Sequence, residues 1–314
     1  MIDDLAVVAR DLTKTFKGGT LALDNLSIEV ARASVLGLLG PNGAGKTTAV
    51  RILTTIIKPD SGTAFILGTD VIRDPARVRS VIGLAGQNAA VDENLTGLEN
   101  LRMVGDLNHL PRGEVKARAR ELISQFDLAD AANRPLKTYS GGMRRRLDIA
   151  ASLVARPAVL FLDEPTTGLD PQSRNDLWEV IEDLVEQGTT VLLTTQYLEE
   201  ADRLARQIVV VDHGREIAKG TPGELKARLG QTVLEIGFLD HEIAVRALGV
   251  LGQLGKIPPT RDGHLVEVPV DDGPKSALEA LRVLDSAEIQ PTTFTLREPS
   301  LDDVFLSITG KTTE

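Results

Sequence analysis

The run Gly40–Thr47 has the residue types and spacing of a loop that holds nucleotide phosphates, G-x-x-x-x-G-K-[ST]. It follows the apolar run Val35–Leu39 and leads into Lys46–Ile57, a segment with helical character. Glycines let backbone N–H groups turn inward around an anion, and the helix that follows adds the positive end of its dipole. Lys46 would reach the terminal phosphates and Thr47 would offer a hydroxyl to Mg²⁺. A glycine-rich structural turn would need neither residue, so we predict a nucleotide site.

Two carboxylates end a second apolar run, Val159–Leu162. Asp163 would hold Mg²⁺ through its water shell, and Glu164, aimed differently because it is one residue further on, would polarise the attacking water. The ordinary alternative is a pair of solvated carboxylates at a strand end. The phosphate loop upstream favours the catalytic interpretation.

A third motif, Ser140–Met143, stands just before the helical run Arg144–Ala155. Its two glycines expose backbone N–H groups at a helix start, which makes a second anion site that a nucleotide at Lys46 does not obviously use. An ordinary helix cap is the alternative. Two phosphate sites imply two chains, in a head-to-tail dimer with ATP held in the interface.

The elements that must position these motifs indicate an α/β domain. Continuous apolar runs such as Thr189–Leu193 are typical of strands buried on both faces of a parallel sheet, and they alternate with helices at 172–186 and 199–205. Alternating strands within residues 5–30, around a turn at 17–19, predict an antiparallel flap. The wholly helical pattern of residues 96–138 predicts a subdomain inserted into the sheet domain.

A second domain follows Thr221. We expect a strand at 232–239, a helix at 240–254, a hairpin around 261–263, a helix at 274–287, a strand at 289–297 and a last helix from Leu301. This βαββαβ order is that of ferredoxin-like folds. The predicted domains are residues 1–228, with the helical subdomain at about 88–140, and residues 229–314.

Composition excludes several classes of protein. The chain of 314 residues is 42% hydrophobic and 25% charged, an ordinary globular balance, and it has no cysteine for disulfides or thiolate metal sites. Its net charge is −10, and from Gly230 onward 7 basic residues face 14 acidic ones. Nucleic acid is therefore an unfavourable partner, the more so because aromatic residues make up only 3%. No signal peptide or membrane-spanning segment is apparent, so we expect a cytoplasmic protein.

Together the motifs resemble those of the ATP-binding subunit of an ABC transporter, over roughly residues 5–225, and they occur in that family's order. The resemblance implies a P-loop ATPase that hydrolyses ATP with Mg²⁺ and drives a membrane partner. The resemblance implies that Gly168–Asp170 is a D-loop, with Asp170 as its carboxylate. It also implies that Gln87 contacts Mg²⁺ together with Thr47 and Asp163. It also places the aromatic Phe16 against adenine, although a core aromatic in the flap and a polar loop residue are sound alternatives for Phe16 and Gln87.

The residues assigned in this way fall into three groups. For ATP binding they are Phe16, Gly40, Pro41, Asn42, Gly43, Ala44, Gly45, Lys46, Thr47 and Thr48. The signature residues that would contact the ATP of the opposite subunit are Ser140, Gly141, Gly142 and Met143. The catalytic residues are Glu164 and Gln196.

Three residues, two in the signature and one after the strand at 191–195, depart from the family's pattern. The signature has Tyr139 and Met143 where leucine and glutamine are commonest, which leaves the contacts of Ser140 and the glycines intact. Gln196 stands where the family usually has a histidine bonded to the γ-phosphate. Glutamine can still donate to a phosphate oxygen, but it neither carries a positive charge nor titrates near neutral pH, so we expect weaker γ-phosphate sensing.

The last part of the chain resembles one subfamily of these ATPases in particular. The run Leu296–Leu306 is similar to the C-terminal part of the daunorubicin and doxorubicin resistance subfamily, whose ATPases pair with a separately encoded membrane permease and energise drug export. This implies a peripheral protein at the cytoplasmic face of the membrane. The same run also fits a terminal amphipathic helix that packs Leu301, Val304, Phe305 and Ile308 onto the accessory sheet.

Other functions stay open. The cargo could be a lipid or polysaccharide, since substrate contacts should lie mainly in the membrane subunit. The chain could be a soluble ABC ATPase with a cytosolic client, although such proteins usually carry two cassettes, a long coiled coil or a basic extension. The ferredoxin-like domain could sense a small molecule, which rests on fold analogy alone.

Overall fold

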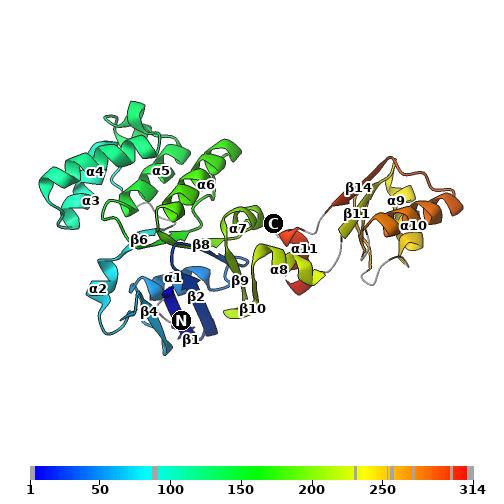
Figure 1. Ribbon diagram of the computed structural model, residues 1–314, viewed down its shortest axis with the longest axis horizontal. Helices are drawn as coiled ribbons and strands as arrows, with labels where there is room; N and C mark the ends of the chain where they lie inside the picture. The colour runs from blue at the N-terminus through cyan, green and yellow to red at the C-terminus, as the bar shows by residue number, and fades with distance from the viewer. Residues whose placement is uncertain are drawn as a thin grey trace. The chain divides into compact units, whose positions relative to one another are not determined.

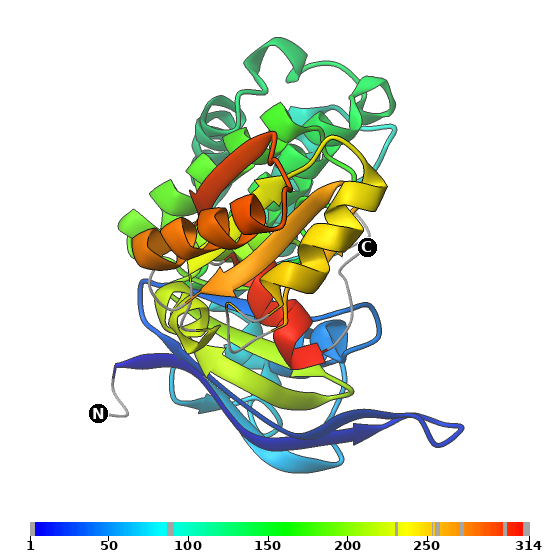
Figure 2. The same cartoon turned by 90° about the vertical axis from the view of Figure 1, so that its right-hand side faces the viewer.

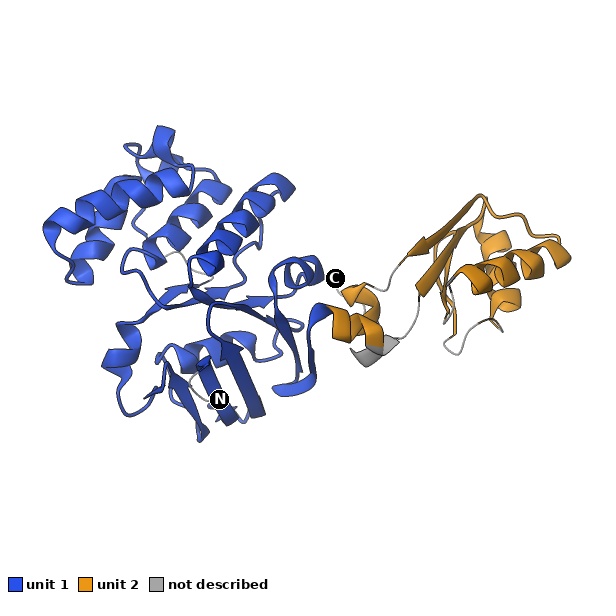
Figure 3. Cartoon of the chain, in the orientation of Figure 1, with its two compact units in different colours: residues 1–222 blue, residues 223–314 orange. Residues whose placement is uncertain are grey.

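The computed structural model describes residues 4–86, 91–229, 232–252, 254, 258–270, 273–297 and 300–309. The chain forms two compact units, residues 1–222 and 223–314 (Figure 3). They divide at the start of helix α8 (Pro222–Leu229), whereas the predicted domain limits of 1–228 and 229–314 place the boundary at its end. Within the described ranges, no helix is long and apolar enough to cross a membrane.

The first unit is built on a six-stranded sheet with the order β10-β9-β3-β8-β7-β6 (Figure 1). All its neighbouring strands run parallel except β10, which is antiparallel to β9. Every residue of β3, β7 and β8 is buried, which confirms the sequence prediction for these strands. Because β8 alone separates β3 from β7, the phosphate loop and the two carboxylates follow strand ends on the same edge of the sheet. The strands are β3 (Val35–Leu39), β6 (Ile82–Ala85), β7 (Val159–Asp163), β8 (Thr190–Thr195), β9 (Gln207–Asp212) and β10 (Arg215–Gly220).

An antiparallel flap with the order β2-β1-β4-β5 covers helix α1 (Lys46–Leu53). Apolar residues of the flap, of α1 and of the central sheet share one buried core. The helix is shorter than the predicted 46–57, because Thr55 adopts a left-handed backbone with φ of 66° that an α-helix cannot continue through. The flap strands are β1 (Leu5–Thr15), β2 (Leu21–Ala31), β4 (Ser61–Ile66) and β5 (Thr69–Asp70), and α2 (Pro75–Arg79) precedes β6.

The helical insert lies between β6 and β7, as predicted. Its first helix begins with a reciprocal cap, in which the Glu99 N–H donates to the Thr96 hydroxyl and the Thr96 N–H donates to the Glu99 carboxylate. Figure 1 shows its helices gathered beside the sheet. They are α3 (Gly97–Leu107) and α4 (Arg112–Gln125), followed by 3₁₀ turns at Ala129–Ala131 and Leu136–Thr138 and by α5 (Gly141–Ser152). Helices α6 (Pro171–Glu186) and α7 (Leu198–Leu204) complete the unit.

The second unit has the predicted βαββαβ order and a four-stranded antiparallel sheet with the order β12-β13-β11-β14. Its two central helices lie on one side of that sheet (Figure 2), and their apolar residues form a core of their own with Leu234, Val266 and Val268. This is the ferredoxin-like arrangement. The elements are β11 (Thr232–Gly237), α9 (His241–Leu251), β12 (Thr260–Asp262), β13 (Leu265–Val270), α10 (Gly273–Ser286), β14 (Thr293–Arg297) and α11 (Leu301–Thr309).

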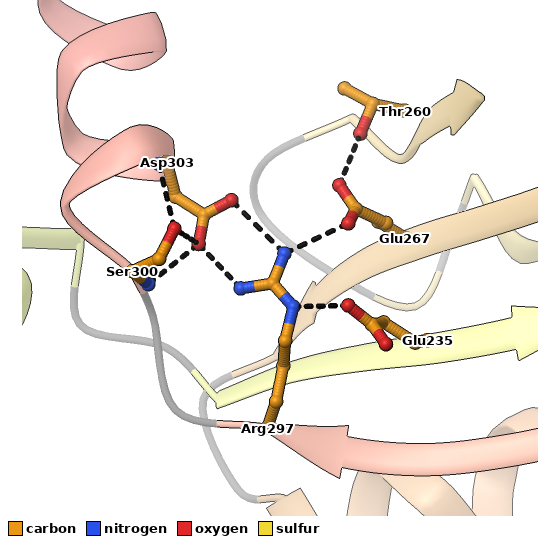
Figure 4. Close-up of polar contacts among 6 residues, drawn as sticks. All are labelled: Glu235, Thr260, Glu267, Arg297, Ser300 and Asp303. Carbon is orange, nitrogen blue, oxygen red and sulfur yellow. Dashed lines mark hydrogen bonds and ion pairs between the residues drawn. The ribbon is translucent and has the colours of Figure 1, made fainter. Parts of the chain in front are cut away.

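Arg297, at the end of β14, connects this sheet to the last helix (Figure 4). Its guanidinium pairs with Glu235 on β11, with Glu267 on β13 at 2.8 Å and with Asp303 on α11 at 2.5 Å. Asp303 also accepts the Ser300 N–H at 2.7 Å, which caps the start of α11. The hydrogen bonds that Arg297 donates to Asp303 raise the pKa of Arg297, although burial opposes this shift. One cation therefore fixes α11 to two strands.

The predicted apolar face of α11 is buried at Leu301, Val304 and Phe305. The side chain of Ile308, predicted to extend this face, lies outside the described residues.

Candidate functional site

The loop between β3 and α1 forms a small cavity of about 170 Å³. Gly45 stands at the N-terminal cap of α1 with φ of 107° and supplies no side-chain acceptor, so the N–H groups of the first turn point to the cavity without a capping side chain. A Cβ at Gly40 would lie 2.2 Å from the Val211 carbonyl oxygen, which requires glycine there. The lining residues are Ala22, Pro41, Asn42, Gly43, Ala44, Gly45, Lys46, Thr47, Thr48 and Glu164.

Lys46 is the buried cation of this loop, only 3% exposed. Its ammonium donates to the Gly40 carbonyl at 2.6 Å and to the Pro41 carbonyl at 3.3 Å, and it lies 3.3 Å from Oε1 of Glu164. Burial lowers the pKa of Lys46, while the Glu164 carboxylate works in the opposite direction. The loop thus holds an ammonium directed at the space that an anion would fill.

Asp163, 3% exposed, receives two hydroxyl groups. Thr47 donates to its Oδ1 at 3.2 Å, and Thr194 donates to the same atom at 2.5 Å. Thr194 faces Asp163 because β7 and β8 run parallel with these two residues in register. The sequence analysis missed Thr194, although its place at the end of an apolar strand was a usable signal.

The donor chemistry here fits Mg²⁺. The Thr47 hydroxyl and the Asp163 carboxylate are hard oxygen donors beside the phosphate cavity, and Mg²⁺ is commonly held by one or two protein oxygens together with phosphate and water. In the ranges the structure describes, no three His, Asp or Glu residues come together as an all-protein metal cage.

Glu164 is the first residue after β7 and lines the phosphate cavity. Its backbone is left-handed, with φ of 51°, so its side chain leaves the strand in a direction different from that of Asp163. Its N–H lies 3.1 Å from both the carbonyl and the hydroxyl oxygen of Thr194. The carboxylate is therefore aimed at the loop by backbone geometry as well as by Lys46.

The signature motif begins helix α5. Ser140 is the cap residue, and its hydroxyl accepts the Met143 N–H at 3.2 Å. Gly141 is exposed, and a Cβ at Gly142 would lie 2.8 Å from the Ser173 hydroxyl oxygen. The predicted alternative of an ordinary helix cap is thus present in geometry, and it leaves Gly141 open to a ligand.

Tyr139 explains one departure from the expected signature. It is 4% exposed, and its hydroxyl donates to the Ala131 carbonyl at 2.7 Å. Its aromatic ring therefore belongs to the core of the helical insert, where it anchors the start of α5.

A second cavity, of about 530 Å³, brings several of these motifs together. Asp170 follows Leu169, a lining residue of this cavity, in the chain. It caps α6 by accepting the Ser173 N–H at 2.9 Å, and this bond lowers the pKa of Asp170. The cavity is lined by Asn42, Gly141, Arg144, Arg145, Asp148, Glu164, Thr167, Gly168 and Leu169.

Three predicted residues have less definite surroundings. Gln196 is half-buried and directly follows β8, at the strand end where Thr194 meets Asp163. Phe16 is 39% exposed in the turn between β1 and β2, and among the described residues it is not part of the cavity lining. Gln87 lies outside the described residues.

Comparison with known proteins shows the family of the chain. The family model of the ABC transporter matches residues 23–167, and that of the ATP-binding protein DrrA1-3-like C-terminal domain matches residues 220–309. The chain is 50% identical to the daunorubicin/doxorubicin resistance ATP-binding protein of Streptomyces peucetius, over 97% of this chain and 92% of that protein. It is 39% identical to the Nod factor export ATP-binding protein I of Ralstonia nicotianae, over 94% and 91%.

A solved structure shares the fold of the first unit. It is the dimeric post-hydrolysis state of an ATP-binding cassette bound to ADP and Pi, with a TM-score of 0.64 and 25% identity, over 68% of this chain and 98% of that one.

Proposed function

The chain belongs to the ABC transporter family as an ATP-binding subunit of the daunorubicin/doxorubicin resistance group, and on this premise we propose that it powers the export of a drug or other amphipathic compound through a separate membrane subunit. The observation that carries the proposal is the meeting of Lys46, Asp163 and Glu164 at one edge of the sheet, with Lys46 Nζ 3.3 Å from Glu164 Oε1. A buried cation, a metal-type carboxylate and a second carboxylate are the parts that phosphoryl transfer from ATP to water requires.

In the proposed site the loop amides and Lys46 bind the β- and γ-phosphates. Thr47 and Asp163 hold Mg²⁺, together with Gln87, and the ion neutralises charge on the phosphates when bound. Thr194 keeps the Asp163 carboxylate in place through its 2.5 Å bond. Phe16 stacks on adenine.

Hydrolysis follows from the position of Glu164. Its carboxylate accepts a proton from water as the water oxygen bonds to the γ-phosphorus, and the bond from that phosphorus to the β,γ-bridging oxygen breaks to release ADP. Gln196 donates to a γ-phosphate oxygen. Catalysis thus rests on positioning and charge stabilisation.

A second copy of the chain completes the site. Ser140, Gly141, Gly142 and Met143 of one subunit close over the ATP of the other, with Asp170 at the interface, and the dimer sits at the cytoplasmic face of the membrane against a permease. The exposed Gly141 and the open cavity beside it support this arrangement. The cassette dimer with ADP and Pi is similar in fold.

The cargo class rests on the relatives. Identity to the drug-resistance protein is 50%, against 39% for the Nod factor export protein, and this favours a drug over an oligosaccharide or lipid.

The test is to capture Glu164→Gln protein from gently solubilised native membranes with Mg-ATP, because blocked hydrolysis should retain the closed dimer on its partner. We expect a multi-span membrane protein in stoichiometric amount, absent when Lys46→Ala protein is used instead. Vesicles containing both subunits should then accumulate daunorubicin when ATP is supplied outside. A closed dimer with only soluble clients would overturn export, and transport of a lipid or polysaccharide alone would correct the cargo.

A further inference from the structure

Arg145, on the second turn of α5, uses every N–H of its guanidinium. Nε donates to the Pro165 carbonyl at 2.7 Å, and Nη2 lies 3.1 Å from the carbonyl oxygens of both Asp163 and Glu164. Nη1 donates to the Gly86 carbonyl at 2.5 Å and reaches Oδ2 of Asp148 at 3.4 Å. Five contacts match the five donors that arginine possesses.

The carbonyl groups that Arg145 binds belong to two strand ends. Asp163, Glu164 and Pro165 are consecutive at the end of β7, and Gly86 follows the neighbouring strand β6. Gly86 is also the residue before Gln87. One side chain of the signature helix therefore holds the backbone that carries both proposed metal and water-activating residues.

The backbone held in this way is strained. Glu164 has φ of 51°, a left-handed conformation that is unfavourable for a residue with a Cβ. Such a conformation persists only when its surroundings determine it. Arg145 donates to the carbonyl oxygens of Asp163, Glu164 and Pro165, and the Glu164 N–H donates to Thr194.

The charge of Arg145 suits this position. Its side chain is 13% exposed and that of Asp148 is 2% exposed, so the pair is largely withdrawn from water. Burial lowers the pKa of Arg145, and the Asp148 carboxylate opposes that shift. Lysine would bring three donors from a single point, which cannot span carbonyl groups from two strands as the planar guanidinium does.

We propose that Arg145 is a positioning residue for Glu164, which holds the water-activating carboxylate in its left-handed conformation and couples it to the signature helix. Because the first turn of that helix is proposed to contact the partner subunit's ATP, movement of α5 at one ATP site changes the aim of Glu164 at the other. The inference rests on the proposed ATPase function for its catalytic part, and the anchoring of residues 163–165 is independent of it.

The test compares full-length wild-type chain with Arg145→Ala, Arg145→Lys and Arg120→Ala, an arginine exposed on α4. Arg145→Ala should lower kcat about 30-fold, because a small misplacement of a catalytic group is that costly. ATP affinity should stay near the wild-type value, whereas the melting temperature should fall, because the buried Asp148 loses its cation. Arg145→Lys should recover part of kcat, and Arg120→Ala should match wild type.

A double-mutant cycle identifies the route of the effect. If Arg145 acts through Glu164, its removal from Glu164→Gln protein should change the residual kcat by less than about 3-fold. A loss in that background as large as in wild type would overturn the proposal. So would an Arg145→Ala kcat within about 2-fold of wild type, or a loss of ATP affinity as large as the loss of kcat.

Hydrogen exchange tests the anchoring without hydrolysis. In Arg145→Ala the amides of Glu164 and Thr167, which bond to Thr194 and Glu164, should exchange faster, while those of α1 should not. Unchanged exchange at both amides would overturn the proposal. A wild-type chain that hydrolyses no ATP would reject the proposed function instead, and the exchange result would still decide whether Arg145 holds residues 163–165.

Discussion

Trp178 donates its indole N–H to Oε1 of Glu200 over 3.1 Å, within the protein interior. The bond joins α6, which Asp170 caps, to α7, which begins two residues after Gln196. Glu200 is fully buried, and its Oε2 has no hydrogen-bond partner among the described residues. Burial raises the pKa of Glu200, which the hydrogen bonds oppose. A buried carboxyl group with a raised pKa thus links the two helices that follow the D-loop and β8.

Replacing Glu200 by glutamine should make stability less dependent on pH. The folded state keeps the Glu200 proton at pH values where the unfolded chain, with a pKa of about 4.3, has released it, so wild-type stability falls as pH rises from there toward the raised pKa. Glutamine has no proton to release. The unfolding free energy of Glu200→Gln relative to wild type should therefore increase across that window in urea titrations. The control is Glu199→Gln, at an exposed neighbour, and equal pH slopes for all three proteins would contradict the prediction.

Glu164→Gln should block hydrolysis while ATP still binds. The amide oxygen can accept from Lys46 as the carboxylate does, but the amide cannot take a proton from water, so kcat should fall at least about 100-fold. Gel filtration with Mg-ATP should show a dimer that wild type holds only briefly. Glu186→Gln, at an exposed glutamate on α6, should hydrolyse normally, and a Glu164→Gln rate near wild type would assign the base elsewhere.

Thr194→Val should impair the Mg²⁺ side of the site. Valine keeps the shape but removes the hydroxyl that bonds Asp163 at 2.5 Å, and a buried carboxylate that loses a partner costs about 1–3 kcal/mol. We expect a higher Mg²⁺ requirement and an ATPase rate about 10-fold lower, from the same loss. Thr194→Ser retains the hydroxyl and should restore the rate. If the valine and serine variants behave alike, the hydroxyl has no role.

Gln196→Ala should slow hydrolysis by removing a donor to the γ-phosphate, and Gln196→His should accelerate it below pH about 6.5, where imidazole becomes charged. Steady-state ATPase rates from pH 6 to 8 would show this as a pH dependence present only in the histidine variant. Equal rates in all three forms would mean that Gln196 has no hydrolytic role.

Arg297→Ala should release α11 from the accessory sheet. Glu235, Glu267 and Asp303 would lose the cation between them, and we expect a loss of about 2 kcal/mol for these partly exposed pairs. Hydrogen exchange should rise in α11 and at the end of β14 but not in β3. Arg297→Lys keeps the charge and should retain part of the stability, whereas full stability of the alanine variant would contradict the account.

The same cluster predicts acid sensitivity. Burial acts to raise the pKa of Asp303, but the bonds from Arg297 and Ser300 outweigh it and hold that pKa below its usual range. The stabilisation is complete above the unfolded pKa of about 3.9 and is lost as pH falls through the lower folded pKa. In wild type we therefore expect α11 to be released in a separate step below that pH. Arg297→Ala lacks the pair and should not show this step.

The sequence predicted those parts of the site whose chemistry is carried by contiguous motifs. Lys46, Thr47, Asp163 and Glu164 stand at fixed offsets from strands that are apolar throughout, so their convergence could be foreseen. Thr194 could not be assigned in the same way, because its contact with Asp163 depends on the register of β8 against β7. In the sequence, Arg145 is one of three consecutive arginines. Its contacts with the ends of β6 and β7 depend on the fold and cannot be inferred from that run.

Element ends were the weaker part of the prediction. Strand β14 begins at Thr293 rather than 289, because Ile289 continues the turn after α10 by donating its N–H to the Leu284 carbonyl at 2.9 Å. Pro291 has no N–H to give to a ladder. Local backbone geometry of this kind does not show in hydrophobic spacing.

The strand order has a consequence for synthesis on the ribosome. Among the described residues, strand β3 pairs with β8 and β9, which begin at Thr190 and Gln207, about 150 and about 170 residues later in the chain. Until those segments emerge from the ribosome, both edges of this apolar strand lack a pairing strand. Chains with such exposed strands are the kind of species that chaperones bind. Translation pauses or truncations before residue 207 should thus yield aggregating fragments. The strands of the accessory unit all lie within residues 232–297 and are therefore made after β3 has gained both partners.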